Sequence, residues 1–228
     1  MKSLVIQLEI NSNLHLKDPQ ESNLGRKIIE ESVILIDKLG IEKFNFKKLA
    51  EHISSTEASI YRYFENKHQL FVYLLNWYWE WMAARIKLNT MNIADPRMKL
   101  RVALGIIIDT ANKNMEIEFV DEEILHRIVV REGAKAYHHK LVDKDNETGF
   151  FLAYKRLSND IAKLITEINE NFKYPQTLAS TLIETANNNL YYAKHLPRLT
   201  DLEDDKALNG NVKKMIEFFC FGLLDSDQ

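Results

Sequence analysis

The chain of 228 residues has 30 Lys and Arg against 33 Asp and Glu, and its net charge of −3 provides no overall attraction to nucleic acid or to an anionic membrane. Seven Gly and four Pro argue against many short strands, and the single cysteine excludes an intramolecular disulfide and suits a reducing cytoplasm. No apolar run is long enough for a bilayer and the N-terminus lacks a signal-peptide pattern, so we expect a cytoplasmic protein with no membrane partner.

The first predicted elements are an arm and a helix. Residues 1–22 are polar and are broken by Pro19, which indicates an N-terminal arm. From Gly25 the apolar residues recur with helical spacing, and Gly40 marks the end of this first helix.

Three more helices are predicted before residue 90. Asn45 is a good N-cap for a short helix whose apolar face contains Phe46, Leu49, Ala50 and Ile53. After the polar break at residues 54–56, a third short helix would bury Ile60 and Phe64. Asn66 can cap a long fourth helix that is rich in aromatic residues.

Helical patterns continue to the end of the chain. Pro96 stands at the first position of another helix, and further helical segments follow over residues 117–133, 150–172, 176–196 and 211–224. Residues 134–149 are predicted to form a short helix and a charged loop, and residues 199–210 an acidic loop. With roughly nine or ten helices and no convincing strand, the predicted fold class is all-α.

Residues 46–64 have the spacing of a helix-turn-helix, whose second helix enters the major groove of DNA. Small or hydrogen-bonding residues at the start of that helix let the backbone approach the bases, and nearby hydroxyl and ammonium groups can reach phosphates. For the tyrosines the alternative is core packing, and for Lys47 and Lys48 it is a solvated face. The predicted DNA-binding residues are Asn45, Lys47, Lys48, Ser55, Thr56, Glu57, Ala58, Ser59, Tyr61, Arg62, Tyr63 and Lys67.

The segment FNFKKLAEHISSTEASIYRYFENKHQLF resembles the DNA-binding domain of the TetR/AcrR family of transcriptional regulators. Leu49-Ala50, the run from Ile60 to Phe64, and the run from Lys67 to Leu70 match the family pattern, and the resemblance covers about residues 24–75. It departs at the turn, where Ser54 replaces a glycine and predicts an altered or strained backbone. Glu57 also places a negative charge near phosphates, and bases and acids balance at nine each over residues 17–70.

The resemblance implies a domain organisation and a mode of action. An N-terminal arm (1–22) would precede a three-helix DNA-binding domain (23–70) and a helical ligand-sensing and dimerisation domain (71–228). In this family the last two long helices pair with those of a second copy, here over about residues 177–195 and 211–224. The expected partners are therefore a double-stranded DNA operator, a small-molecule effector and a second copy of the chain.

Other kinds of site have weaker signals. The aromatic segment over residues 76–85 is interpreted mainly as core, although one of Trp77, Tyr78 and Trp81 could line a ligand pocket. His138 and His139 are adjacent on the chain and would make a poor chelating pair, so no metal site is predicted. No cofactor is expected, and no phosphate loop, nucleophile elbow or paired carboxylate indicates an enzyme.

The function predicted from the sequence is a homodimeric DNA-binding transcriptional regulator, a repressor that a small molecule releases from DNA. One alternative is a helical protein-interaction module whose helix-turn-helix does not bind DNA, which the balanced charge of residues 17–70 favours. The other is an enzyme that processes a small molecule in the C-terminal bundle, for which the sequence offers no support.

Overall fold

The computed structural model describes residues 8–109 and 120–226, and these residues form helices and turns without a strand. The predicted all-α fold class is therefore confirmed. The chain divides into two compact units, one with residues up to Trp81 and from 111 to Tyr154, the other with Met82 to 110 and Lys155 onward. Within the described ranges, no helix has both the length and the apolar character of a membrane span.

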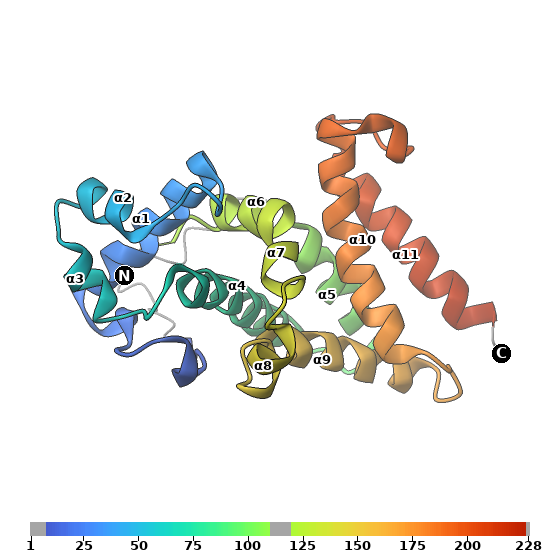
Figure 1. The fold of residues 1–228 in the computed structure, drawn as a ribbon. Coiled ribbons are helices and arrows are strands. Elements are labelled where there is room, and N and C mark those ends of the chain that lie inside the picture. Colours follow the sequence, from blue (N-terminus) through green and yellow to red (C-terminus); the bar gives the residue numbers. More distant parts are fainter. Residues whose placement is uncertain (1–7, 110–119, 227–228) are drawn as a thin grey trace, which may run out of the picture. The chain divides into compact units, whose positions relative to one another are not determined.

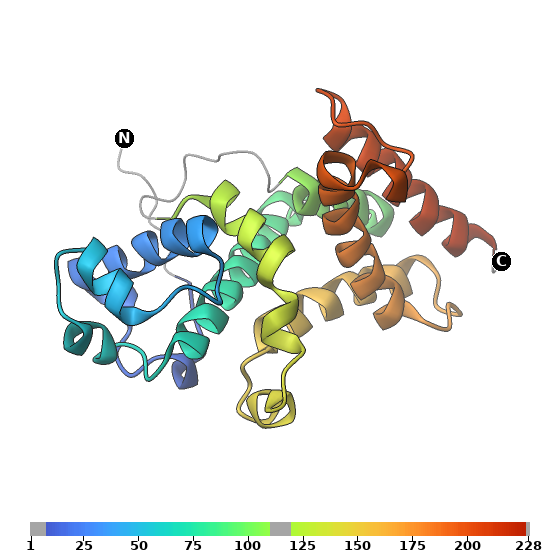
Figure 2. The same ribbon diagram turned by 45° about the horizontal axis from the view of Figure 1, so that its top comes forward.

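The first unit contains the helix-turn-helix and the segments that support it (Figure 1). In chain order these elements are η1 (Ser12–Leu14), η2 (Pro19–Glu21), α1 (Asn23–Leu39), α2 (Phe46–His52), α3 (Glu57–Tyr61), the first part of α4 (Lys67–Thr90), α6 (Glu122–Glu132), α7 (Ala134–Tyr137) and α8 (Val142–Glu147). Helix α1 packs against both α2 and α6. Figure 2 shows α1, α2 and α3 gathered at one end of this unit.

Helix α4 is buried around its whole circumference in the first unit. Residues 70–79 are all buried, although a helix at a protein surface would expose one face. The amide of Asn76, inside this run, donates to the carbonyl oxygens of Val72 (2.9 Å) and Phe150 (2.6 Å). Both N–H groups of its side-chain amide thus have partners within the protein, as buried polar groups require.

The described part of the N-terminal arm is folded onto the first unit. Gln20 bonds both backbone groups of Leu8, and the backbone N–H of Leu16 donates to the carbonyl of Tyr63 at 2.7 Å. The arm also approaches α1 so closely that a Cβ on Gly25 would lie 2.3 Å from the carbonyl oxygen of Pro19. A glycine at this position is therefore a packing requirement.

The second unit contains the end of α4, α5 (Pro96–Asp109), most of α9 (Leu152–Ile168), α10 (Pro175–His195), η3 (Pro197–Leu199) and α11 (Leu208–Ser226). Helices α10 and α11 pack side by side, and α5 packs against both. Arg101 bonds Glu217 at 2.9 Å, and Arg97 pairs with Asp225, so two ion pairs connect α5 to α11.

Most predicted helices occur, with differences at their ends. Residues 142–147, predicted as part of a charged loop, form α8. The predicted helix over residues 117–133 begins at Glu122, where Asp121 accepts from the N–H of Ile124, and its residues 117–119 lie outside the described ranges. The predicted acidic loop ends earlier than expected, because α11 already begins at Leu208.

Candidate nucleic-acid interface

Two polar side chains set the starts of α2 and α3. Asn45 accepts a hydrogen bond from the backbone N–H of Lys48 at 2.9 Å, and Thr56 accepts one from the N–H of Ser59 at 3.2 Å. The Thr56 hydroxyl is also 2.9 Å from the Ser59 hydroxyl. These caps satisfy N–H groups that the first turn of a helix leaves unpaired, which is important for an α3 of only five residues.

The turn between the two helices carries an unusual backbone. The N–H of Ser55 bonds the carbonyl of Ala50 (2.9 Å), and the N–H of Ser54 bonds that of Glu51 (3.3 Å). This pair of bonds is the Schellman motif, which ends a helix with a left-handed residue that is usually glycine. Ser54 occupies that position with φ 55°, so it has the strained backbone that the sequence predicted.

The start of α3 forms an exposed polar surface. Thr56, Glu57 and Ala58 are exposed, and Ser55 and Ser59 are half-buried. Ile60, at the other side of the helix, is fully buried and anchors it. The predicted base-reading residues thus lie together at one accessible helix start, with small side chains beside the backbone.

Tyr61 and Tyr63 lie in different environments. The Tyr61 ring packs edge-on against Phe46 of α2, with centroids 5.0 Å apart, and the residue is 47% exposed. Tyr63 is only 5% exposed, and its hydroxyl shares a 2.8 Å hydrogen bond with the Ser22 hydroxyl. Tyr63 thus packs under the N-terminal arm, which agrees with the core-packing alternative for this tyrosine, and a phosphate contact by its hydroxyl stays a prediction.

The predicted cations also divide into two groups. Lys47 and Arg62 are exposed, and neither has a hydrogen bond or ion pair to the residues that the structure describes. The ammonium of Lys48, also exposed, donates to the carbonyl of Lys43 at 2.7 Å. Lys47 and Arg62 are thus the two cations of this surface whose charged ends are available to a ligand.

Lys67 has a structural role that the sequence did not reveal. Its ammonium donates to the carbonyl oxygens of Ile41 (3.1 Å), Glu42 (3.2 Å) and Phe44 (3.3 Å) in the loop after α1. An ammonium has three donors, and here all three are used. A phosphate contact by Lys67 would compete with these three bonds, and it stays a prediction.

Lys27 was not predicted to support the site, but its ammonium donates to the carbonyl of Ile53 at 3.1 Å. This bond connects α1 to the turn that precedes α3. Its only sequence signal is a lysine on a polar helix face, which is too common to be informative.

The three residues proposed for a ligand pocket are buried in the first unit. Trp77, Tyr78 and Trp81 are each at most 2% exposed, and the rings of Trp77 and Trp81 stack with centroids 6.4 Å apart. The Tyr78 hydroxyl is 2.8 Å from Nδ1 of His126. This burial agrees with the aromatic core favoured from the sequence, and pocket lining by one of the three stays a prediction.

Comparisons with known proteins agree with this architecture. Residues 28–74 match the family model described as bacterial regulatory proteins, tetR family. No significant relative is found among curated proteins.

Solved structures of similar fold cover most of the chain. A putative TetR-family transcriptional regulator from Syntrophomonas wolfei superposes with a TM-score of 0.66 and 16% identity, covering 90% of this chain and 97% of its own. AibR, solved with isovaleryl coenzyme A and operator DNA, has a TM-score of 0.60, 16% identity and coverages of 85% and 97%. The fatty acid degradation regulator FadR from Bacillus halodurans has the same TM-score and identity, with coverages of 85% and 93%. Residues 28–74 thus match the helix-turn-helix segment of the TetR family of bacterial regulatory proteins, and the chain as a whole shares its fold with these solved structures.

Proposed function

We propose that this protein is a homodimeric transcriptional repressor that a small molecule releases from its DNA operator. The observation that carries the proposal is the exposed start of α3, where Thr56, Ala58 and Ser59 present small polar side chains on a capped helix. Such a helix start can approach base edges in the major groove. Tyr61 and Arg62 lie beside it and would contact phosphates, which position the protein on the duplex.

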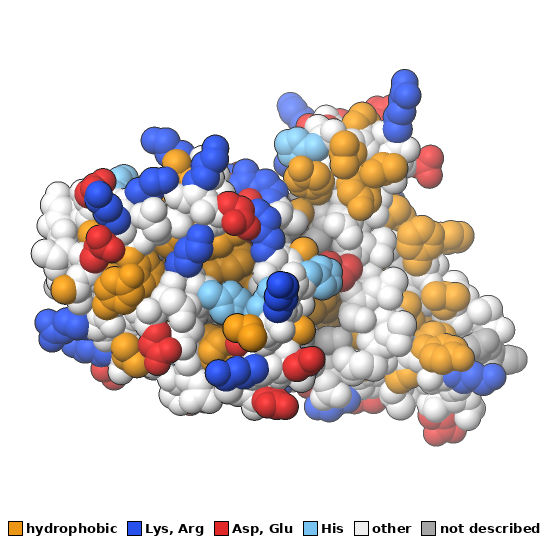
Figure 3. Space-filling view, viewed as in Figure 1, with side chains coloured by type: hydrophobic (Ala, Val, Ile, Leu, Met, Phe, Trp, Pro, Cys, Tyr) orange, Lys and Arg blue, Asp and Glu red, His pale blue; other side chains and the backbone are white. Residues whose placement is uncertain are grey.

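A second copy of the chain would pair through α10 and α11. Apolar side chains gather at the surface over these two helices in Figure 3. On α11, Phe218 is 74% exposed, Phe219 43% and Leu223 48%. An apolar surface of this kind is unfavourable in water and typical of an interface. A dimer would present two α3 helices to half-sites roughly 34–36 Å apart.

Release from DNA by a small molecule is inferred from the regulators whose fold this chain shares. One structure of similar fold contains isovaleryl coenzyme A together with operator DNA, which supports an effector-controlled mechanism for this chain. An effector that prefers one arrangement of the helices would change DNA affinity by its coupling energy. Typical couplings of about 1–3 kcal/mol correspond to about 5- to 150-fold.

A protein-interaction module is the second candidate, and one observation favours it. Lys48 and Lys67, two of the four cations predicted beside α3, donate to backbone carbonyl oxygens of their own chain. Residues 17–70 also have no net charge. A surface of this kind would bind DNA weakly outside its operator.

DNA binding by the full-length protein separates the two candidates. Fluorescence anisotropy with fragments from upstream of its own gene, at several salt concentrations, should show selective binding that weakens as salt rises. Arg62→Ala should weaken binding about tenfold, the value of about one charge-assisted hydrogen bond, and lower the salt slope by about one per subunit.

Two further variants control this experiment. Tyr61→Phe removes only a hydroxyl and keeps the ring that packs on Phe46, so reduced affinity would identify a phosphate contact. Lys163→Ala removes one exposed charge from α9 and should leave affinity unchanged. Binding that is equal for all fragments, or unaffected by Arg62→Ala, would support the interaction module instead.

A further inference from the structure

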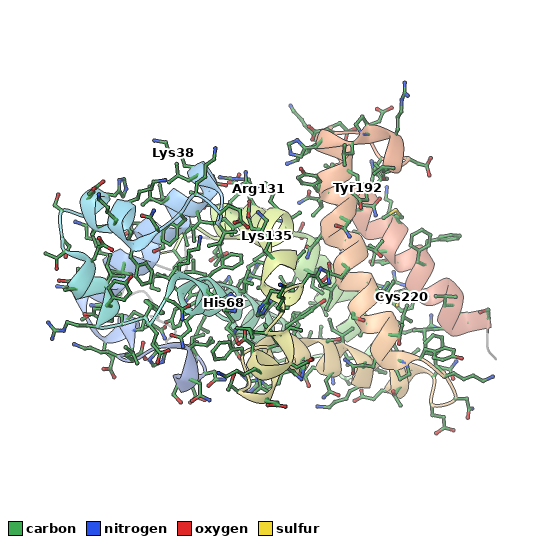
Figure 4. The ribbon with its side chains drawn as sticks, viewed as in Figure 1. Lys38, His68, Arg131, Lys135, Tyr192 and Cys220 are labelled. Carbon is green, nitrogen blue, oxygen red and sulfur yellow. The ribbon has the colours of Figure 1, made fainter. Side chains whose placement is uncertain are left out.

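Two histidines and one aspartate converge in the first unit from distant parts of the sequence. His68 lies in the first turn of α4, His139 follows α7, and Asp145 lies in α8. Nε2 of His68 is 2.7 Å from Oδ2 of Asp145, and Nε2 of His139 is 3.1 Å from the same oxygen. One potential ligand atom of each residue lies within 4.8 Å of the other two. We call these side chains the 68–139–145 cluster (Figure 4 labels His68).

Hydrogen bonding satisfies only part of this cluster. His68 and Asp145 form a hydrogen bond of 2.7 Å. Nε2 of His139 is buried, yet no hydrogen bond of acceptable geometry reaches it from the residues that the structure describes. Buried polar atoms nearly always have a partner. Nε2 of His139 thus lies 3.1 Å from Oδ2 of Asp145 without forming a hydrogen bond to it. Two ligands of the same metal ion are arranged in this way, because each directs its lone pair at the ion and not at the other ligand.

The spacing is close to that of a metal site. Around a tetrahedral ion with bonds of about 2.0–2.2 Å, neighbouring ligand atoms lie about 3.4 Å apart. The two nitrogen–oxygen distances of 2.7 and 3.1 Å must therefore open by about 0.3–0.7 Å. The ligand atoms of the two histidines lie within 4.8 Å of each other and must approach by up to about 1.4 Å. The side chains of His68, His139 and Asp145 are 35%, 24% and 13% exposed, so an ion can enter and small rotations can accommodate it.

We propose that the 68–139–145 cluster binds one divalent transition-metal ion, for which Zn²⁺ is the best-matched probe. Two imidazoles and one carboxylate suit zinc, whereas magnesium and calcium prefer oxygen ligands alone. Three protein ligands leave a fourth position for water. Binding through Nε2 of His139 puts its proton on Nδ1, so the 3.3 Å contact from the N–H of Leu141 to Nδ1 is given up.

A bound ion would join the start of α4 to α8. Helix α4 begins at Lys67, shortly after α3 ends at Tyr61. The metal-bound connection between α4 and α8 would therefore lie next to the helices of the helix-turn-helix. Metal binding goes beyond the proposed regulatory function and does not depend on it. The adjacent pair His138 and His139 contributes only one ligand, and the other two come from outside that pair.

Calorimetry on the full-length protein, stripped with a chelator and then titrated with ZnCl₂, tests the proposal. The wild type should bind one ion with a dissociation constant in the micromolar range or below, and Zn²⁺ should raise its melting temperature. His139→Ala and Asp145→Asn should each weaken binding at least about tenfold and abolish the thermal shift. His138→Ala, which removes the exposed neighbouring imidazole, should bind as the wild type does.

Two results would overturn the metal site. One is equal Zn²⁺ affinity in the wild type and both ligand variants, which would indicate adventitious binding to other surface histidines. The other is no saturable binding by the wild type up to about 100 µM Zn²⁺. Circular dichroism first checks that each variant is folded. Asp145→Asn keeps the size of the side chain. If His139→Ala does not fold, the Zn²⁺ affinity of Asp145→Asn is compared with that of the wild type.

Discussion

Replacing Ser54 with glycine should stabilise the protein. Ser54 is the left-handed residue of the Schellman motif that ends α2, with φ 55°, and its side chain is exposed. An L-residue in this conformation brings its Cβ close to the next carbonyl oxygen, a contact that glycine does not have. The existing backbone bonds of Ser54 and Ser55 require no change.

The magnitude follows from two opposing terms. Relief of the left-handed strain contributes about 1–2 kcal/mol. Glycine has more conformational entropy than serine in the unfolded chain, and this opposing term lowers the gain in the free energy of unfolding by about 0.5–1 kcal/mol. The net increase in the free energy of unfolding should be about 0.5–1 kcal/mol, which for a chain of this length corresponds to a melting temperature about 1–4 °C higher.

Differential scanning calorimetry and urea unfolding measure this gain. Ser54→Ala is the matched control, because alanine keeps the Cβ and its strain but lacks the hydroxyl. It should change the melting temperature by less than Ser54→Gly does. A glycine variant that is no more stable than the wild type, or an alanine variant that gains as much, would refute the assignment of strain to this φ value.

Three further changes test other parts of the structure. Gly25→Ala should cost at least about 2 kcal/mol in urea unfolding, because its Cβ would lie 2.3 Å from backbone of Pro19; an unchanged midpoint would contradict this packing. Lys67→Met keeps the apolar stem but removes the ammonium from three carbonyl oxygens, and should cost about 1–2 kcal/mol, whereas the exposed Lys43→Met should cost little. Phe218→Asp should give a monomer in sedimentation at concentrations where the wild type and a Leu141→Asp control are dimers; a dimeric variant would place the interface elsewhere.

The thiol of Cys220 provides a pH-dependent prediction. Burial, the largest cause, raises its pKa from 9.0 to about 12. The folded protein therefore retains this proton more strongly than the unfolded chain, and the associated stability is present below pH 9 and lost as the pH rises towards 12. At pH 8 the thiol should react with an aromatic disulfide far more slowly in the native protein than in urea. Equal rates would show that Cys220 is accessible.

Local features of this protein could be predicted from the sequence because their causes are local. Asn45 and Thr56 start their helices through hydrogen bonds that span three residues, and these bonds occur as expected. The strain at Ser54 follows from a serine at a turn position where the family has glycine. The all-α fold follows from helical spacing of apolar residues and from few breakers.

Contacts between distant residues depended on the tertiary structure. Tyr63 and Lys67 look like surface phosphate ligands in the sequence. In the fold, the arm covers the Tyr63 ring, and three carbonyl oxygens surround the Lys67 ammonium. His68 meets Asp145 across 77 positions of the chain. Spacing along the sequence predicts neighbours within a helix, but it does not specify which loop carbonyl or imidazole another segment brings to the same place.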